Sequence, residues 1–98
     1  MFKLPNQNGV LEACRAFGVR RLEVFGSSVR FPESARDVDL LVDFGEHPVK
    51  GYAAAFFGLK ETLEKLFGKP VDLVTSDSLD HPYFRQSVEA TKQLVYEA

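Results

Sequence analysis

Apolar residues recur at helical spacing near the start of the chain and then begin to alternate with polar ones. A helix is predicted over residues 8–17, ending at Gly18, because four apolar residues share one helical face: Val10, Leu11, Cys14 and Phe17. The alternation over residues 20–25 predicts a strand, which stops abruptly at Gly26. The chain therefore opens with a helix followed by a strand.

The second predicted strand shows the clearest alternation in the sequence. Its apolar face carries Val38, Leu40, Val42 and Phe44. Its other face carries Asp37, Asp39, Leu41 and Asp43. Successive strand residues point to opposite sides of a sheet, so the acids gather on the side away from the core.

The rest of the chain predicts a helix over 52–67 that stops at Gly68 and Pro70, a strand over 71–75 and a last helix over 82–95 with Asp80 as its N-cap. The predicted order is helix, strand, turn, strand, helix, strand, helix. This order predicts an α/β (α+β) fold, with a small mixed sheet whose helices pack on one face and leave the other face open. The length of 98 residues predicts a single domain over 1–98.

Composition excludes several classes of protein. A net charge of −2 argues against binding nucleic acid through bulk charge. One cysteine, Cys14, rules out an internal disulfide, and His47 and His81 are too far apart in sequence to indicate a metal pair. The sequence contains neither an apolar run long enough to cross a membrane nor a signal-peptide core, so a soluble cytoplasmic protein is expected.

Gly26 and Ser27 fall where the first strand gives way to a possible helical turn. A glycine lets the backbone approach a ligand closely, and free N–H groups at a turn suit phosphate oxygens. Taken alone, the pair is also compatible with an ordinary turn.

Three acids follow on the next two predicted strands. Asp37 and Asp39 project from the same face of one strand, and two like charges this close favour a neutralising cation such as Mg²⁺. Asp72 lies inside the next apolar strand and completes a three-carboxylate cluster if the two strands are neighbours. Such a cluster binds two metals, or one metal beside a general base. Solvated surface acids are the alternative interpretation.

The combination is more specific than its parts. Gly-Ser after the first strand, Asp-x-Asp in the second and Asp in the third resemble the signature of the polymerase-β-type nucleotidyltransferase superfamily. The run GSSVRFPESARDVDLLVDF over 26–44 and VDLVT over 71–75 resemble its minimal nucleotidyltransferase (MNT) branch, along with a closing helix taken to end in Val95, Tyr96 and Glu97. The likeness covers nearly the whole chain from about Val10 onwards.

The resemblance implies a role for each matching position. Gly26 and Ser27 would hold a nucleoside triphosphate, and Arg30 would lie near its phosphates. Asp37 and Asp39 would bind Mg²⁺, and Asp72 would bind metal or activate the acceptor hydroxyl. It further implies that ATP is the donor, and that the chain is an antitoxin that adenylylates a tyrosine of a partner HEPN-type toxin.

Two positions depart from the branch and leave alternatives open. Phe31 stands where a glycine usually follows the arginine, and Arg36 stands where a serine usually precedes Asp-x-Asp. Arg36 could pair with a carboxylate and weaken metal binding, or contact phosphate. A catalytically weakened antitoxin that blocks its partner by stoichiometric binding is therefore the main alternative. Transfer to a small molecule is a third, for which the chain shows no second substrate-binding domain.

Overall fold

The computed structural model describes residues 4–45 and 51–98, without the side chains of residues 77 and 78. His47 lies outside the described residues. The elements in chain order are α1 (Gln7–Ala16), β1 (Arg21–Val24), α2 (Ser27–Arg30), β2 (Val38–Asp43), α3 (Tyr52–Phe67), β3 (Val71–Thr75), a 3₁₀ turn η1 (Ser76–Asp80), α4 (Pro82–Thr91) and β4 (Gln93–Glu97).

The strands of the described residues form one mixed sheet in the order β3-β2-β1-β4. β1 runs antiparallel to β2 and to β4, and β2 and β3 are parallel. The helix α3 makes the crossover between the two parallel strands, as such a connection requires. The predicted small mixed α/β sheet is therefore confirmed.

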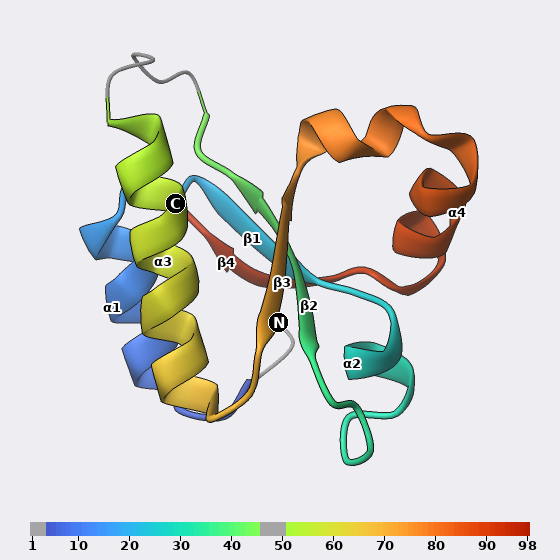
Figure 1. Ribbon diagram of the computed structural model, residues 1–98, viewed down its shortest axis with the longest axis horizontal. Helices are drawn as coiled ribbons and strands as arrows, with labels where there is room; N and C mark the ends of the chain where they lie inside the picture. Colours follow the sequence, from blue (N-terminus) through green and yellow to red (C-terminus); the bar gives the residue numbers. More distant parts are fainter. Residues whose placement is uncertain (1–3, 46–50) are drawn as a thin grey trace.

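One face of the sheet is covered by α1 and α3, which lie side by side against it (Figure 1). The core between these layers is apolar throughout. Its fully buried side chains include Val10, Cys14, Leu22, Leu40, Val42, Leu59 and Leu63. The inward-pointing residues of β2 are those that the alternation predicted, so burial of this face places Asp37, Asp39 and Asp43 on the other side.

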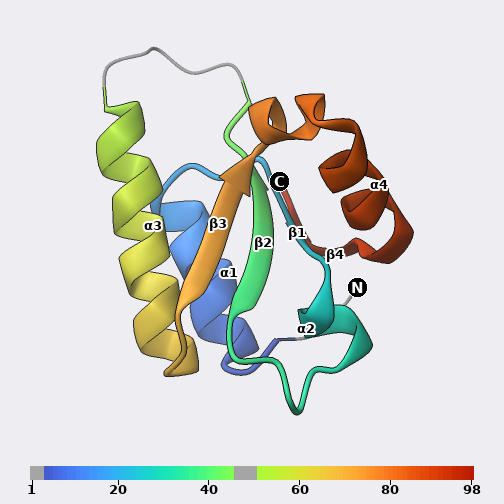
Figure 2. The same cartoon turned by 45° about the vertical axis from the view of Figure 1, so that its right-hand side comes forward.

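The opposite face is covered only in part. α4 and η1 lie over one end of it, and α2 lies at the other end (Figure 1, Figure 2). The contact is a small second core in which Phe84 and Val88 of α4 meet Phe25 and Leu41, with the rings of Phe25 and Phe84 5.7 Å apart and edge to face. The prediction that helices pack on one face thus holds for α1 and α3, whereas α4 packs on the other.

The end of the chain differs from the prediction. The last helix ends at Thr91, and Gln93–Glu97 forms the edge strand β4 paired with β1. The prediction of a helix to Val95, and of a closing helix that ends in Val95, Tyr96 and Glu97, was wrong. The spacing of Val88 and Val95 is compatible with a helix, but backbone hydrogen bonding to β1 outweighs it. The N-cap of α4 is His81 in place of Asp80, which closes η1.

No helix among the described residues is long and apolar enough to cross a membrane.

Candidate active site

The three acids predicted from the sequence lie on neighbouring strands. β2 and β3 are in register with Asp39 directly opposite Asp72, so both side chains leave the sheet on the same face. Asp37 precedes Asp39 by two residues and shares that face. Asp37 and Asp72 are exposed and Asp39 is half-buried. The condition for a three-carboxylate cluster, that the two strands be neighbours, is met.

Burial and neighbouring charge both act on the carboxyl group of Asp39. Its partial burial, and then the carboxylates of Asp72 and Asp37, raise the pKa of Asp39 above the ordinary value. No ion pair among the described residues involves these three carboxylates. The cluster is therefore a concentration of negative charge that the described protein groups leave uncompensated.

A divalent cation matches the chemistry of this donor set. Three carboxylates are hard oxygen ligands of the kind that Mg²⁺ takes alongside the phosphates of a substrate. As they stand, no three acidic, cysteine or histidine side chains in the described ranges converge on one metal position. Asp37 and Asp72 are exposed, so their side chains can change rotamer. A bound cation would relieve the repulsion that their carboxylates exert on Asp39.

Gly26 lies directly against this cluster. Its backbone adopts φ 68° and ψ −142°, a conformation that side chains disfavour. A Cβ atom added there would lie 2.8 Å from Oδ2 of Asp39, closer than van der Waals contact permits. Glycine is thus needed at this position for its conformation and for the space it leaves beside the carboxylate.

The backbone N–H of Gly26 is already engaged. It donates to Oγ1 of Thr91 at 2.7 Å, and that hydroxyl donates in turn to the carbonyl of Ser87 at 3.0 Å. The end of α4 therefore anchors the turn after β1. Gly26 offers a ligand close approach, whereas the first N–H groups of α2, on Ser27 and Ser28, have no partner among the described residues.

The remaining predicted nucleotide-binding residues lie on α2. Ser27 and Arg30 are exposed, and Arg30 forms no ion pair with a described residue. Ser27 directly follows Gly26, which lies against Asp39, so the structure brings the predicted glycine turn and the predicted acids together at one place on the partly open face.

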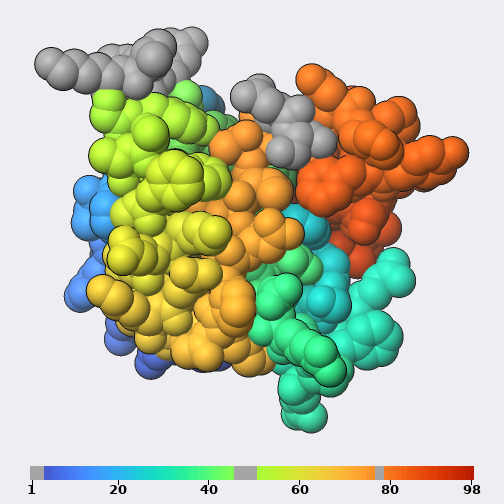
Figure 3. Space-filling view, viewed as in Figure 1, coloured from blue at the N-terminus to red at the C-terminus, as the bar shows by residue number. Residues whose placement is uncertain are grey.

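The two departures from the MNT pattern lie in the segment after α2, which projects from the body of the molecule (Figure 3). Phe31 is 63% exposed, and Arg36 is exposed and pairs with no described carboxylate. Of the two alternatives for Arg36, pairing with an acid of the cluster is therefore not realised among the described residues.

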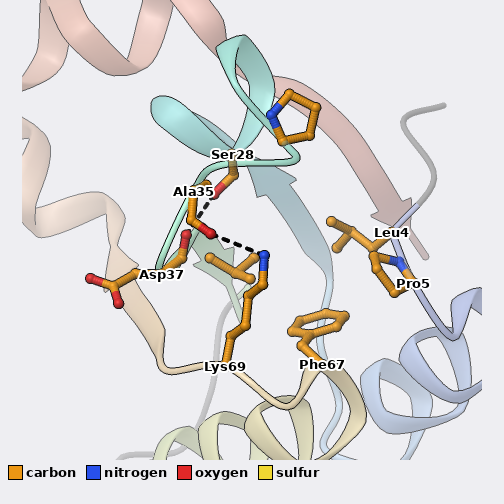
Figure 4. Close-up of a pocket in the computed structure, with 9 residues that line it drawn as sticks. Leu4, Pro5, Ser28, Ala35, Asp37, Phe67 and Lys69 are labelled. Carbon is orange, nitrogen blue, oxygen red and sulfur yellow. Dashed lines mark hydrogen bonds between the residues drawn. The ribbon is translucent and has the colours of Figure 1, made fainter.

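A hollow of about 270 Å³ lies next to this segment, and Asp37 forms part of its wall. The ammonium of Lys69 donates to the carbonyl of Ala35 there, at 2.9 Å, and the Asp37 carboxylate points away from the hollow (Figure 4). Lys69 consequently does not neutralise the acid cluster. The hollow is lined by Leu4, Pro5, Ser28, Pro32, Ala35, Asp37, Val38, Phe67 and Lys69.

Two residues at the site were not predicted from the sequence. Thr91 falls at helical spacing from Phe84 and Val88, and a hydroxyl among these apolar residues is the only sequence signal for its contact with Gly26. Ser28 is buried, and its hydroxyl bonds to the backbone of Asp37 and of Asp39, on either side of Val38. No local pattern marks Ser28, because its partners lie about ten residues further along the chain.

A mixed sheet with a glycine turn after its first strand and acids on the next two strands defines a domain of the nucleotidyltransferase type. Comparison with protein families agrees, because the nucleotidyltransferase domain model matches residues 8–95. The chain belongs to the nucleotidyltransferase domain family, and the relatives below confirm its resemblance to the minimal branch.

Individual relatives extend this result. The chain is 50% identical over 64 residues to the protein adenylyltransferase MntA of Thermococcus cleftensis. These aligned residues make up 64% of this chain and 62% of the relative. A solved structure described provisionally as a minimal nucleotidyltransferase is 35% identical, with a TM-score of 0.67 over 89% of this chain and 86% of the other. A complex of a tri-AMPylated HEPN toxin of Shewanella oneidensis with an MNT antitoxin matches in fold at 20% identity, with a TM-score of 0.63 over 95% and 71%.

Proposed function

We propose that the chain is a Mg²⁺-dependent nucleotidyltransferase that moves AMP from ATP to a hydroxyl group, namely that of a tyrosine on a partner HEPN-type toxin, and so acts as an antitoxin. The observation that carries this proposal is the register of Asp39 opposite Asp72, with Gly26 packed against Asp39. The name of the 50% identical relative and the partner in the solved complex support the choice of adenylyl transfer and of acceptor.

Each site residue has a distinct part in this proposal. Asp37 and Asp39 would hold the metal, and Asp72 would hold metal or accept the proton of the attacking hydroxyl. The space at Gly26 would admit the triphosphate, with the Ser27 hydroxyl and the unengaged N–H groups of α2 as donors and Arg30 beside the phosphates. When bound, Mg²⁺ supplies neutralisation of the phosphate charge.

The reaction would be an in-line displacement at the α-phosphorus. The acceptor oxygen forms the new bond to phosphorus, the bond to the bridging oxygen breaks, and pyrophosphate leaves. The protein's contribution is to orient the acceptor and the triphosphate and to receive the hydroxyl proton, not to form a covalent intermediate.

Intact mass spectrometry tests this function. The chain is incubated with Mg²⁺, ATP and the product of the adjacent gene, and the mass of that partner should increase by whole adenylyl groups. The increase should disappear in an Asp37→Ala/Asp39→Ala variant. It should persist in Asp43→Asn, a matched change on the same face of β2 outside the acid cluster.

Stoichiometric binding without transfer is the competing function. It is favoured by exposed Phe31, a large apolar side chain beside the site, and by the lack of a converged metal position. A stable complex whose partner gains no mass with wild-type protein would support this alternative and contradict adenylyl transfer.

A further inference from the structure

Ser28 occupies an unusual place for a hydroxyl group. Its side chain is buried, with the residue only 6% exposed, in the middle of the short helix α2. The hydroxyl donates to the carbonyl of Asp37 at 3.1 Å and accepts from the N–H of Asp39 at 3.0 Å. A single side chain therefore contacts the backbone of both acids of Asp-x-Asp.

The two backbone groups that Ser28 contacts point toward the β1 side of β2. On that side the last link of the sheet is the N–H of Phe25, which donates to the carbonyl of Asp39 at 3.1 Å, because β1 ends at Val24. On the other side, the N–H of Val38 donates to the carbonyl of Pro70. Ser28 thus supplies the hydrogen bonds that a longer β1 would have made.

This contact fixes the geometry of the acids. Hydrogen bonding on both sides of Val38 holds this part of β2 extended, which is the condition for Asp37 and Asp39 to project from one face. Ser28 also directly follows Ser27 on α2, so the same side chain ties the segment proposed to face the phosphates to the acids of Asp-x-Asp.

We propose that Ser28 is a positioning residue that sets the separation between the two metal-binding carboxylates and the phosphate-binding turn. This inference rests on the proposed function and adds to it a residue that touches neither metal nor nucleotide. The role requires one atom that donates and accepts at the same time, which a hydroxyl provides and a methyl group does not. Supporting residues of this kind typically change metal affinity or activity by roughly 10–100-fold when they are removed.

A Mg²⁺ titration in the presence of ATP tests the proposal without any partner protein. Isothermal titration calorimetry would give the Mg²⁺ concentration at half-saturation for wild type, Ser28→Ala, Ser28→Thr and Ser34→Ala. We expect Ser28→Ala to raise this concentration roughly 10–100-fold. Ser28→Thr, which keeps the hydroxyl, should have a half-saturation concentration close to that of wild type. Ser34→Ala, a matched change at an exposed serine in the next turn, should leave it unchanged.

The fold of each variant is checked by circular dichroism in EDTA. If Ser28→Ala does not fold, Ser28→Cys carries the test, because the thiol is close in size but a weak donor and acceptor. If the folded Ser28→Ala or Ser28→Cys variant keeps the wild-type half-saturation concentration, the proposed role of Ser28 is overturned. The proposed function of the protein would then be unaffected. Failure of the wild-type protein itself to bind Mg²⁺ with ATP contradicts the proposed function and this inference together.

Discussion

The two faces of the sheet have different roles in this small domain. The face under α1 and α3 is lined by fully buried aliphatic side chains such as Leu40 and Leu63. The other face carries Asp37, Asp39 and Asp72 and is covered by α4 at one end only. Buried apolar area stabilises the fold on the first face, whereas clustered like charges cost stability on the second.

β2 belongs to both faces because its side chains alternate. The same six residues, Val38–Asp43, contribute Leu40 and Val42 to the core and Asp39 to the site. Anchoring through the apolar side therefore keeps the acids in place despite their repulsion. This division predicts that substitutions on the two faces will separate stability from ligand binding.

The largest effect on stability is expected in the covered face. Leu63→Ala removes a fully buried side chain of α3 and should lower the free energy of unfolding by roughly 2–5 kcal/mol. Phe57→Ala, on the same helix but 62% exposed, should change it by less than about 0.5 kcal/mol. Urea unfolding measures both. Equal losses in the two variants would contradict the assignment of this face as the main source of stability.

Gly26→Ala should affect both stability and binding. The unfavourable conformation costs about 1–3 kcal/mol, and the new Cβ would push against Asp39, so binding of Mg²⁺ and ATP should be lost. Gly68→Ala is a matched control, with φ also positive at +66° and nothing within 4 Å of the added atom. It should cost about 1–2 kcal/mol and leave binding unchanged. Titration calorimetry combined with thermal unfolding separates the two effects, and normal binding by Gly26→Ala would argue against this site.

The hydrogen bond that links α4 to the turn after β1 should contribute less to the free energy of unfolding. Thr91→Val removes the acceptor of the Gly26 N–H and should destabilise the protein by about 1–2 kcal/mol, with weaker ATP binding. Thr91→Ser keeps the hydroxyl and should recover most of the binding. If Val and Ser variants bind ATP equally, the hydrogen bond does not position the turn.

The last effect concerns Cys14 in the covered core and is confined to alkaline pH. Burial raises the pKa of its thiol to about 12, despite the nearby positive charge of Arg15. The folded state then keeps a proton that the unfolded chain loses above its ordinary value of 9.0, so this thiol contributes a loss of stability as pH rises from 9.0 to about 12. The difference between wild type and Cys14→Ala in urea unfolding across that range isolates the contribution. A difference that does not change with pH would contradict it.

Much of the fold could be predicted because some elements are specified locally. Helix 52–67 and strand 71–75 were predicted with the bounds that α3 and β3 have, since Gly68 and Pro70 separate two strong patterns. β4 was missed because its pairing with β1, more than 65 residues earlier, decides its conformation. A short segment with Leu94, Val95 and Tyr96 is compatible with a helix or a strand until that partner is known.

The placement of the candidate site residues was predictable in part, but their supporting contacts were not. Alternation alone places Asp37 and Asp39 on one face, whereas the position of Asp72 opposite Asp39 depends on parallel pairing through α3. The hydroxyls of Ser28 and Thr91 act on backbone groups that are distant in sequence. Such contacts leave no periodic signal, so they emerge only from the assembled structure.

If the open face holds a metal and a triphosphate as proposed, its clustered carboxylates should lower the stability of the protein until these ligands bind. Thermal unfolding of wild type, Asp39→Asn and Asp43→Asn, each with and without Mg²⁺ and ATP, tests it most directly. Because the pKa of Asp39 is raised in the fold, its ionised form destabilises the protein at neutral pH, and Asp39→Asn should unfold at a higher temperature than wild type without ligand. Mg²⁺ with ATP should then stabilise wild type and Asp43→Asn, but not Asp39→Asn. Equal unfolding temperatures for wild type and Asp39→Asn without ligand, and equal gains with it, would contradict a ligand-binding role for Asp39.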